Sequence, residues 1–447
     1  MRFDRFLFAA SILSILSAAC VKHSTTAPTS PAIAVVPPNE AVAIVRSLTD
    51  EVGPRSAGSP GDRAAVAWGL RTMKRLELSN VRAEPVMVRH WQRGVEVGEI
   101  VAPSPHRLSL TALGGSGATP DAGIEAEVIE VASLDAIQSC TPAAFDGKIV
   151  FINKATARAR DGAGYGAAIS TRTRGPIECA RRGAAAVVIR SIGTDNNRLP
   201  HTGITRTYGQ AKAIAAAAMS NPDADLVHRL IADGKRVRMR LTLTPQLLED
   251  EQSANVIGEV VGGETPNEIV LIGAHLDSWD LGDGALDDGA GVAIVLAAIR
   301  EIALQKPPPK RTVRAVLFAD EETGARGAKA YAEAHGREPH VVGIEADLGS
   351  GAPYAIRVHG DVMKARLNEL AQAVAHLGIA ADTGDTSGGT DLGPMFDLGM
   401  PVIDVMQDAT LYFDVHHTAN DTFDKIDAAA LAKTAHAFAV LARAVAD

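Results

Sequence analysis

The half of the sequence from residue 254 onward alternates short apolar runs with longer amphipathic ones. The runs EIVLIGAH, TVRAVLFAD, VVGIEADLG and PVIDVM indicate strands, and DGAGVAIVLAAIREIA, GARGAKAYAEAHG, VMKARLNELAQAVAHLG and AAALAKTAHAFAVLARAVAD indicate helices. This alternation predicts an α/β fold, a mostly parallel sheet flanked by helices on both faces. In such sheets functional groups gather just beyond the carboxyl ends of the strands.

The rest of the chain divides into further parts. At 447 residues the chain is too long for one ordinary domain. Two helices are expected between residues 39 and 76, so residues 39–122 are interpreted as the first part of the catalytic domain. The sequence pattern changes at residues 123–246, where KIVFINK indicates a short strand and RVRMRLTLTP an alternating strand. This pattern predicts a small inserted α/β domain. Residues 247–447 complete the catalytic domain.

Residues 1–20 have the pattern of a secretory signal peptide. Arg2 and Arg5 precede an apolar run, which ends in small residues before Cys20. The run is shorter than the roughly 20 apolar residues of a membrane-spanning helix. We expect an exported protein with residues 21–38 as a flexible tether. Two outcomes remain open: a lipid anchor at Cys20, giving a periplasmic or outer-membrane lipoprotein, or simple cleavage and secretion.

Two cysteines follow Cys20, and both fall in the predicted insert. Cys140 and Cys179 could pair in an oxidising compartment, and two buried thiols are an equally good interpretation. The net charge of -9 argues against nucleic acid as a partner, because nucleic-acid binders usually carry a basic surface.

Metal-ligand side chains cluster where the predicted strands end. EIVLIGAH ends at His275, with Asp277 close behind, and TVRAVLFAD is followed by Glu321 and Glu322. Three further groups stand near strand ends or in nearby loops: Asp347, Asp287 with Asp288, and His416 with His417. One such carboxylate is usually a solvated turn residue, but five clusters on one sheet edge are poorly explained that way.

The residue types point to zinc, because imidazole and carboxylate ligands without thiolate suit zinc, manganese or cobalt. Two divalent ions carry four positive charges, and Asp287, Glu322 and Asp347 supply three negative ones. The remaining positive charge is what binds a hydroxide. A phosphate-binding loop at Gly282–Gly289 is rejected, because it has no Lys-Ser/Thr ending and its acidic neighbours would repel phosphate.

Four ordered motifs resemble one family. HLDSWDLGDGALDDGAG (275–291), DEETGARG (320–327), EADLGSG (345–351) and HHTANDT (416–422) resemble the co-catalytic zinc exopeptidases of the aminopeptidase and glutamate carboxypeptidase family, metallopeptidase family 28. A branch of that family shares the Ser278-Trp279-Asp280 extension, the PHTGI stretch at 200–204 and the double histidine. The resemblance runs from about residue 40 to the end and implies a protease-associated-like insert.

The resemblance implies a role for each matching residue. His275, Asp287 and Asp347 would hold one zinc ion, and Asp287, Glu322 and His417 the other, with Asp287 bridging. Asp277 would hydrogen-bond the ligand histidine. Glu321 would be the general base acting on a metal-bridging hydroxide. In such enzymes the peptide bond after the bridging aspartate can be cis, which here would be the Asp287–Asp288 bond.

His416 and the loop 386–391 complete the candidate site. Several relatives carry a tyrosine at the position of His416 that stabilises the oxyanion; this histidine could donate a similar hydrogen bond or only support the site. The TSGGTD loop is expected to line the substrate pocket.

The function these residues predict is an exported two-zinc exopeptidase acting on dipeptides or short peptides. Two alternatives are a cyclising acyltransferase with one zinc ion and a binding protein without activity. Retention of both histidines and all three ligand carboxylates favours two metals. The sequence identifies neither the peptide nor the end recognised, and it does not decide between monomer and homodimer.

Overall fold

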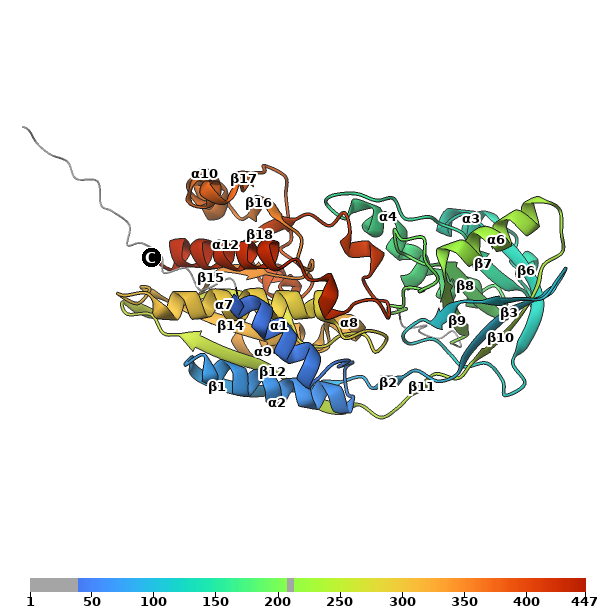
Figure 1. The fold of residues 1–447 in the computed structure, drawn as a ribbon, viewed down its shortest axis with the longest axis horizontal. Coiled ribbons are helices and arrows are strands. Elements are labelled where there is room, and N and C mark those ends of the chain that lie inside the picture. Colours follow the sequence, from blue (N-terminus) through green and yellow to red (C-terminus); the bar gives the residue numbers. More distant parts are fainter. Residues whose placement is uncertain (1–38, 207–212) are drawn as a thin grey trace, which may run out of the picture. The chain divides into compact units, whose positions relative to one another are not determined.

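The computed structural model describes residues 39–206 and 213–447, so the predicted signal peptide, tether and Cys20 lie outside the described residues. The first sheet is drawn with its flanking helices in Figure 1. Its order is β1 (Ser79–Val88), β12 (Glu251–Val260), β14 (Arg311–Phe318), β13 (Thr265–His275), β15 (His340–Glu345), β18 (Val402–Gln407), β16 (Pro353–His359) and β17 (Ala380–Ala381).

The expected parallel pairing holds at the centre of this sheet and not at its flanks. Strands β14, β13, β15 and β18 pair in parallel, whereas β1, β12 and β16 pair antiparallel with their inner neighbours. Only residues 261–264 join β12 to β13. A parallel crossover needs a dozen residues or more, so this short link forces β12 to run the opposite way. The fold is therefore a mixed α/β sheet flanked by helices.

Helices cover both faces of the first sheet. One face carries α1 (Asn39–Glu51), α2 (Pro60–Arg75), α7 (Ala290–Leu304), α10 (Asp361–Val374) and α12 (Ala428–Ala446). The other carries α9 (Arg326–His335) and α11 (Gly393–Asp397), whose Ala328, Tyr331 and Met395 pack in one cluster with Val316 and Phe318. Helix α12 is long and apolar enough to cross a membrane, but 67% of that stretch is buried within the protein, as expected of a core helix.

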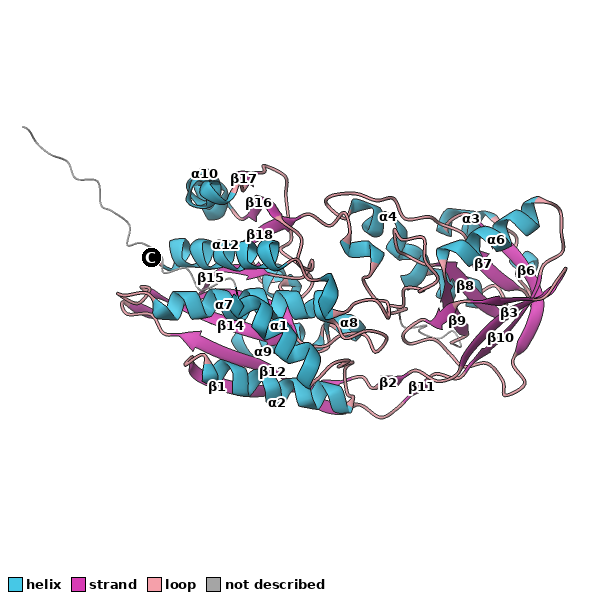
Figure 2. Cartoon of the chain, in the orientation of Figure 1, coloured by secondary structure: helices cyan, strands magenta, loops and turns pink. Residues whose placement is uncertain are grey.

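The chain leaves the first sheet through β2 (Trp91–Gln92) and returns through β11 (Gln246–Leu247), and these two short strands pair antiparallel. Between them lies a second sheet, seen at the right of Figures 1 and 2. Its order is β4 (His106–Leu108), β3 (Glu96–Ala102), β10 (Arg238–Leu243), β6 (Ile124–Val131), β7 (Ile149–Ile152), β8 (Ala186–Arg190), β9 (Ala215–Met219) and β5 (Leu110–Ala112).

We call residues 93–245 the insert. The boundary expected at residue 123 is corrected to about residue 93, because β3, β4 and β5 pair with strands of the second sheet. The pattern of apolar and polar residues changes only where the parallel strands of the second sheet begin. The sequence of the antiparallel β3 resembles a continuation of the first domain. A likeness of the insert to protease-associated domains stays a prediction.

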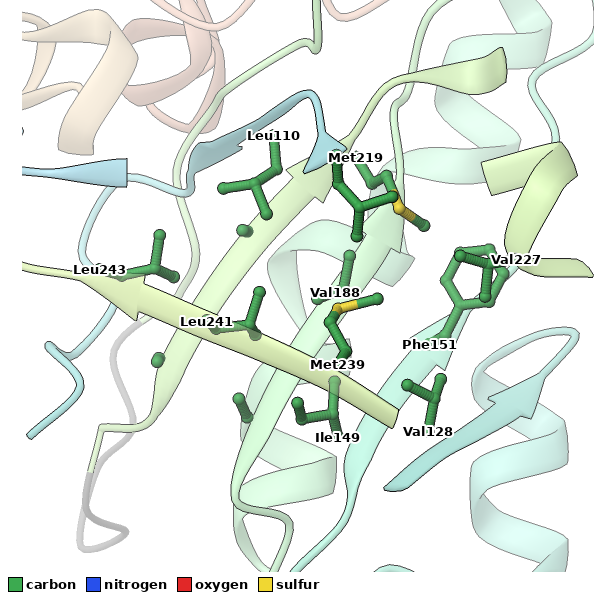
Figure 3. Packing of buried hydrophobic residues seen from close by; sticks show 14 of the residues in the cluster. Leu110, Val128, Ile149, Phe151, Val188, Met219, Val227, Met239, Leu241 and Leu243 are labelled. Atoms are coloured by element: carbon green, nitrogen blue, oxygen red, sulfur yellow. The ribbon is translucent and has the colours of Figure 1, made fainter. Parts of the chain in front are cut away.

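The insert has its own apolar core on both sides of its sheet. Side chains of β7 alternate, with Ile149 and Phe151 on one face and Val150 and Ile152 on the other. Figure 3 shows the first face, where Phe151 lies among Val128, Val227 and Met239. The helices of the insert are α3 (Leu134–Ser139), α4 (Ala163–Thr173), α5 (Gly175–Ala180) and α6 (Asn221–Ala232).

Both cysteines of the insert are free thiols in the structure. Cys179 is fully buried in the cluster on the second face, and Cys140 packs against the same cluster. Burial raises the pKa of the Cys179 thiol to about 12. A thiol held in its neutral form is a poor nucleophile, so Cys179 acts as a small apolar side chain.

Candidate metal centre

The predicted ligands converge from five parts of the first domain. His275 is the last residue of β13, Asp347 follows β15, and Glu322 belongs to α8 (Glu321–Gly324) directly after β14. Asp287 lies in the turn η2 (Ala285–Gly289), and His417 follows the turn η4 (Tyr412–Asp414). All except Asp347 are less than 10% exposed. His275, Glu322 and Asp347 follow parallel strands that end at one edge of the sheet, and Asp287 and His417 reach the same place from loops.

Asp287 lies between the two histidines. Its Oδ1 is 3.2 Å from His275 Nε2, and its Oδ2 is 3.1 Å from His417 Nε2. His275 Nε2 is also 3.4 Å from Asp347 Oδ1, and His417 Nε2 is 3.0 Å from Glu322 Oε2. The carboxylate of Asp287 thus presents one oxygen to each half of the cluster, which is the arrangement of a bridging ligand.

The donor set fits divalent metal ions. Donor atoms of His275, Asp287 and Glu322 lie within 4.8 Å of one another. Asp287 Oδ2 and Glu322 Oε1 are buried without a hydrogen-bond donor among the described residues. Buried carboxylate oxygens are costly unless paired or bound to a metal, so these two oxygens fit the role of metal ligands.

Asp288 stands beside these ligands but is occupied differently. Its Oδ2 accepts a hydrogen bond from the backbone N–H of His275 at 3.1 Å, and its Oδ1 accepts one from Gly291 at 3.0 Å. Both oxygens are therefore used within the fold. The Asp287–Asp288 peptide bond is cis, as the resemblance implied.

His416 stacks on His417 with ring centroids 3.6 Å apart. Its Nε2 is 3.4 Å from Asp287 Oδ2, and its Nδ1 is buried without a hydrogen-bond partner within residues 39–206 and 213–447. Burial and the neighbouring His417 hold the pKa of His416 well below its usual value, so the ring is neutral. Because His417 touches two ligand carboxylates and His416 touches one, the geometry favours His417 as the ligand.

Asp277 lies between His275 and the first turn of α8. Its two oxygens accept hydrogen bonds from the backbone N–H groups of Glu321 at 3.0 Å and Glu322 at 3.3 Å. His275 Nδ1 instead donates to the backbone oxygen of Asp277 at 3.0 Å, while the Asp277 carboxylate lies 3.6 Å away. The expected hydrogen bond between the Asp277 carboxylate and His275 stays a prediction, and in the structure that carboxylate binds the first turn of α8.

Glu321 opens onto a cavity of about 730 Å³ that it shares with Glu322, Asp347, His416 and His417. Burial raises the pKa of Glu321 well above its usual value, and the negative charges of Asp347 and Glu322 raise it further. Residues of the insert line the same cavity, namely Tyr165, Ile169, Arg172 and Ile204. Thr390, from the loop 386–391 that is expected to line the substrate pocket, also lines it.

Two residues that hold the ligands had no predicted role. Trp279 donates from its indole Nε1 to Glu322 Oε2 at 2.6 Å. Thr202 of the insert exchanges two hydrogen bonds with His417: its N–H donates to the His417 backbone oxygen at 3.0 Å, and its carbonyl accepts from His417 Nδ1 at 3.2 Å. The Ser278-Trp279-Asp280 and PHTGI stretches had marked these positions without indicating what they do.

The chain is similar in sequence to metallopeptidases. The family model described as peptidase family M28 matches residues 255–442. Carboxypeptidase Q of Bos taurus is 34% identical over 408 residues, covering 90% of this chain and 84% of that protein. Carboxypeptidase Q of Homo sapiens is 32% identical over 406 residues, with the same two coverages.

Solved structures with the same fold include members of that family. A peptidase M28 precursor from Shewanella amazonensis SB2B is 44% identical, with a TM-score of 0.90 over 92% of this chain and 93% of that one. An aminopeptidase from Aneurinibacillus sp. strain AM-1 is 20% identical, with a TM-score of 0.63 over 91% of this chain and 93% of that one. The second likeness concerns the fold alone.

Proposed function

Because this chain belongs to peptidase family M28 and is a metallo-exopeptidase, we propose that it hydrolyses dipeptides or short peptides with two zinc ions and Glu321 as general base. The observation that carries the proposal is Asp287, whose two oxygens face His275 and His417 separately. A carboxylate placed in this way can serve two metal ions at once.

The residues would divide between the two ions through Asp287. His275 and Asp347 would hold one zinc ion with it, and Glu322 and His417 the other. Zinc bound there would lower the pKa of a coordinated water toward about 7 and polarise a peptide carbonyl.

Glu321 supplies the proton transfers. Its carboxylate lines the cavity and makes no hydrogen bond among the described residues. In the sequence Glu321 directly precedes the ligand Glu322. It can therefore take a proton from the attacking water and deliver it to the nitrogen of the leaving amine. The neutral ring of His416, whose Nδ1 has no partner in the described part of the chain, could donate a hydrogen bond to the developing oxyanion.

The two alternative functions from the sequence remain distinguishable by metal content. A cyclising acyltransferase of this fold would need one zinc ion, and a binding protein would need none. The convergence of three carboxylates and two histidines favours two ions. Two zinc equivalents per chain would support the proposed two-zinc hydrolysis, and one or none would contradict it.

The central test is Glu321→Gln. The change keeps the shape of the side chain but removes the base, so kcat should fall by about 10²- to 10⁴-fold while zinc content stays at two per chain. The matched control is Glu333→Gln, the same change at an exposed position on α9. Turnover of Glu321→Gln near the wild-type rate would exclude Glu321 as the base.

A substrate panel tests which end of the peptide is recognised. Free dipeptides, N-blocked dipeptides and aminoacyl anilides should be compared on the zinc-loaded enzyme. We expect the free dipeptides to be hydrolysed fastest. A preference for aminoacyl anilides would indicate an aminopeptidase instead.

We also propose that residues 1–20 direct export of the chain. The support is the basic start, the apolar run and the small residues before Cys20. Mass spectrometry of the mature N-terminus would distinguish an acylated Cys20 from a simply cleaved chain. An intact Met1 on the mature protein would contradict export by this signal.

A further inference from the structure

The two halves of the metal centre are held by different parts of the molecule. We call His275 and Asp347 the strand-end half and Glu322 and His417 the loop half; Asp287 is common to both. The strand-end half is held within the first domain, since His275 Nδ1 donates to the backbone oxygen of Asp277 and the backbone N–H of His275 donates to Asp288. The loop half receives its hydrogen bonds from Trp279 and Thr202.

Trp279 follows β13 of the first domain in the sequence, but its side chain packs in the apolar core of the insert. Its ring is 5% exposed and forms part of the same apolar cluster as Ile149, Phe151 and Met239 of the insert. It meets Trp91 edge to face at 6.1 Å, and a Cβ added to Gly114 would lie 2.2 Å from its Cη2. The insert thus fixes the ring whose N–H donates to Glu322.

Thr202 orients the second ligand of the loop half. Its carbonyl accepts the Nδ1–H of His417, which leaves Nε2 as the ring nitrogen that faces Asp287 and Glu322. A hydrogen bond of this kind selects the tautomer and the orientation of a ligand histidine. Thr202 itself is fully buried and anchored to the insert by its Oγ1, which donates to Ala112 at 2.8 Å.

Arg93 joins these two supports. Its guanidinium binds both oxygens of Asp280, the residue after Trp279, at 2.7 and 2.8 Å. The same guanidinium donates to the carbonyl of Ala112 at 2.9 Å and to Thr202 Oγ1 at 3.2 Å. One partly buried cation therefore connects the Trp279 segment, the edge of the insert sheet and the Thr202 segment.

We propose that the insert sets the metal affinity of the loop half, with Trp279 and Thr202 as positioning residues, whereas the strand-end half binds its ion independently of the insert. This inference rests on the proposed two-zinc function. It gives the insert a role in metal occupancy in addition to forming a wall of the substrate cavity.

Trp279→Phe is the direct test, because it keeps an aromatic ring in the cluster and removes the N–H that donates to Glu322. Equilibrium dialysis of the full-length protein against buffers of graded free Zn²⁺ should show one ion bound as in the wild type and the other weakened by about 10- to 100-fold. At saturating zinc, kcat/KM should recover toward the wild-type value.

Trp91→Phe is the matched control. It makes the same change in the partner of the same aromatic pair, and Trp91 Nε1 is buried without a hydrogen bond among the described residues. We expect both zinc affinities to stay at wild-type values. Equal weakening of the loop half by Trp91→Phe and Trp279→Phe would reduce the effect to general packing and overturn the role of the indole N–H.

Gly114→Ala tests the route from the insert without changing any residue that touches a ligand. The new Cβ would press on Trp279, so the loop half alone should lose affinity. Gly166→Ala is its control, because Gly166 lies in α4 with nothing within 4 Å of an added Cβ. Circular dichroism of each variant confirms that it is folded.

The outcomes separate the inference from the function on which it rests. Equal loss at both halves, or no loss in Trp279→Phe and Gly114→Ala, would overturn the inference while leaving two zinc ions in the wild type. A wild-type enzyme with one zinc equivalent would contradict the two-zinc function. The inference would then be decided by whether Trp279→Phe weakens that single ion.

Discussion

His275 and His417 face the same carboxylate from two different kinds of structure. His275 ends a central strand of the first sheet, and its position follows from the register of β13 with β14 and β15. His417 sits in a loop at a backbone φ of +61°, and its ring is aimed by a carbonyl of the insert. The comparison teaches that a metal centre can join one half built by the sheet with another that depends on a distant segment.

His417→Ala should give the largest effect that distinguishes the two halves. Removing this ligand should reduce zinc from two ions to about one, with kcat/KM falling by roughly 10³-fold, since a metal ion contributes several kcal/mol of charge stabilisation. Metal analysis and steady-state kinetics measure both quantities. His416→Ala is the control and should keep two ions; full occupancy in His417→Ala would transfer the ligand role to His416.

Phe151→Ala is expected to weaken the insert rather than the first sheet. Phe151 is fully buried in the insert cluster shown in Figure 3, and truncating such a side chain costs about 3–5 kcal/mol. Thermal unfolding followed together with zinc release should show the loop half losing its ion first.

The control for this change is Phe318→Ala in the core of the first sheet. That cavity lies beneath β14, so both ions should be released together with the unfolding of the sheet. Release of both ions together in Phe151→Ala as well would show that the two halves are not separately supported.

The same difference between the halves explains what the sequence could predict. The metal-ligand side chains at the ends of EIVLIGAH, TVRAVLFAD and VVGIEAD could be placed together from the sequence, because parallel strands end at one edge of their sheet. The antiparallel strands β1 and β16 are not followed by such residues. The predicted start of the insert was 30 residues too late, because the pattern of apolar and polar residues in β3 resembles that of the segment before it. The Thr202–His417 exchange joins residues 215 positions apart through backbone atoms, and no side-chain pattern encodes such a contact.

Asp277→Asn should produce the smallest of these effects. Asp277 contacts both halves of the metal centre, through the backbone of Glu322 and through His275. An asparagine offers one acceptor oxygen where two backbone N–H groups, those of Glu321 and Glu322, now bind, and its amide would face the other N–H. The first turn of α8 would shift, lowering kcat/KM and the zinc affinity of the loop half by about 10- to 100-fold. The strand-end ion should stay, because His275 Nδ1 donates to the backbone oxygen of residue 277, which the substitution preserves. Dialysis against graded free Zn²⁺ measures both affinities. Loss of the strand-end ion instead would show that the Asp277 carboxylate, 3.6 Å from His275, supports that half as well.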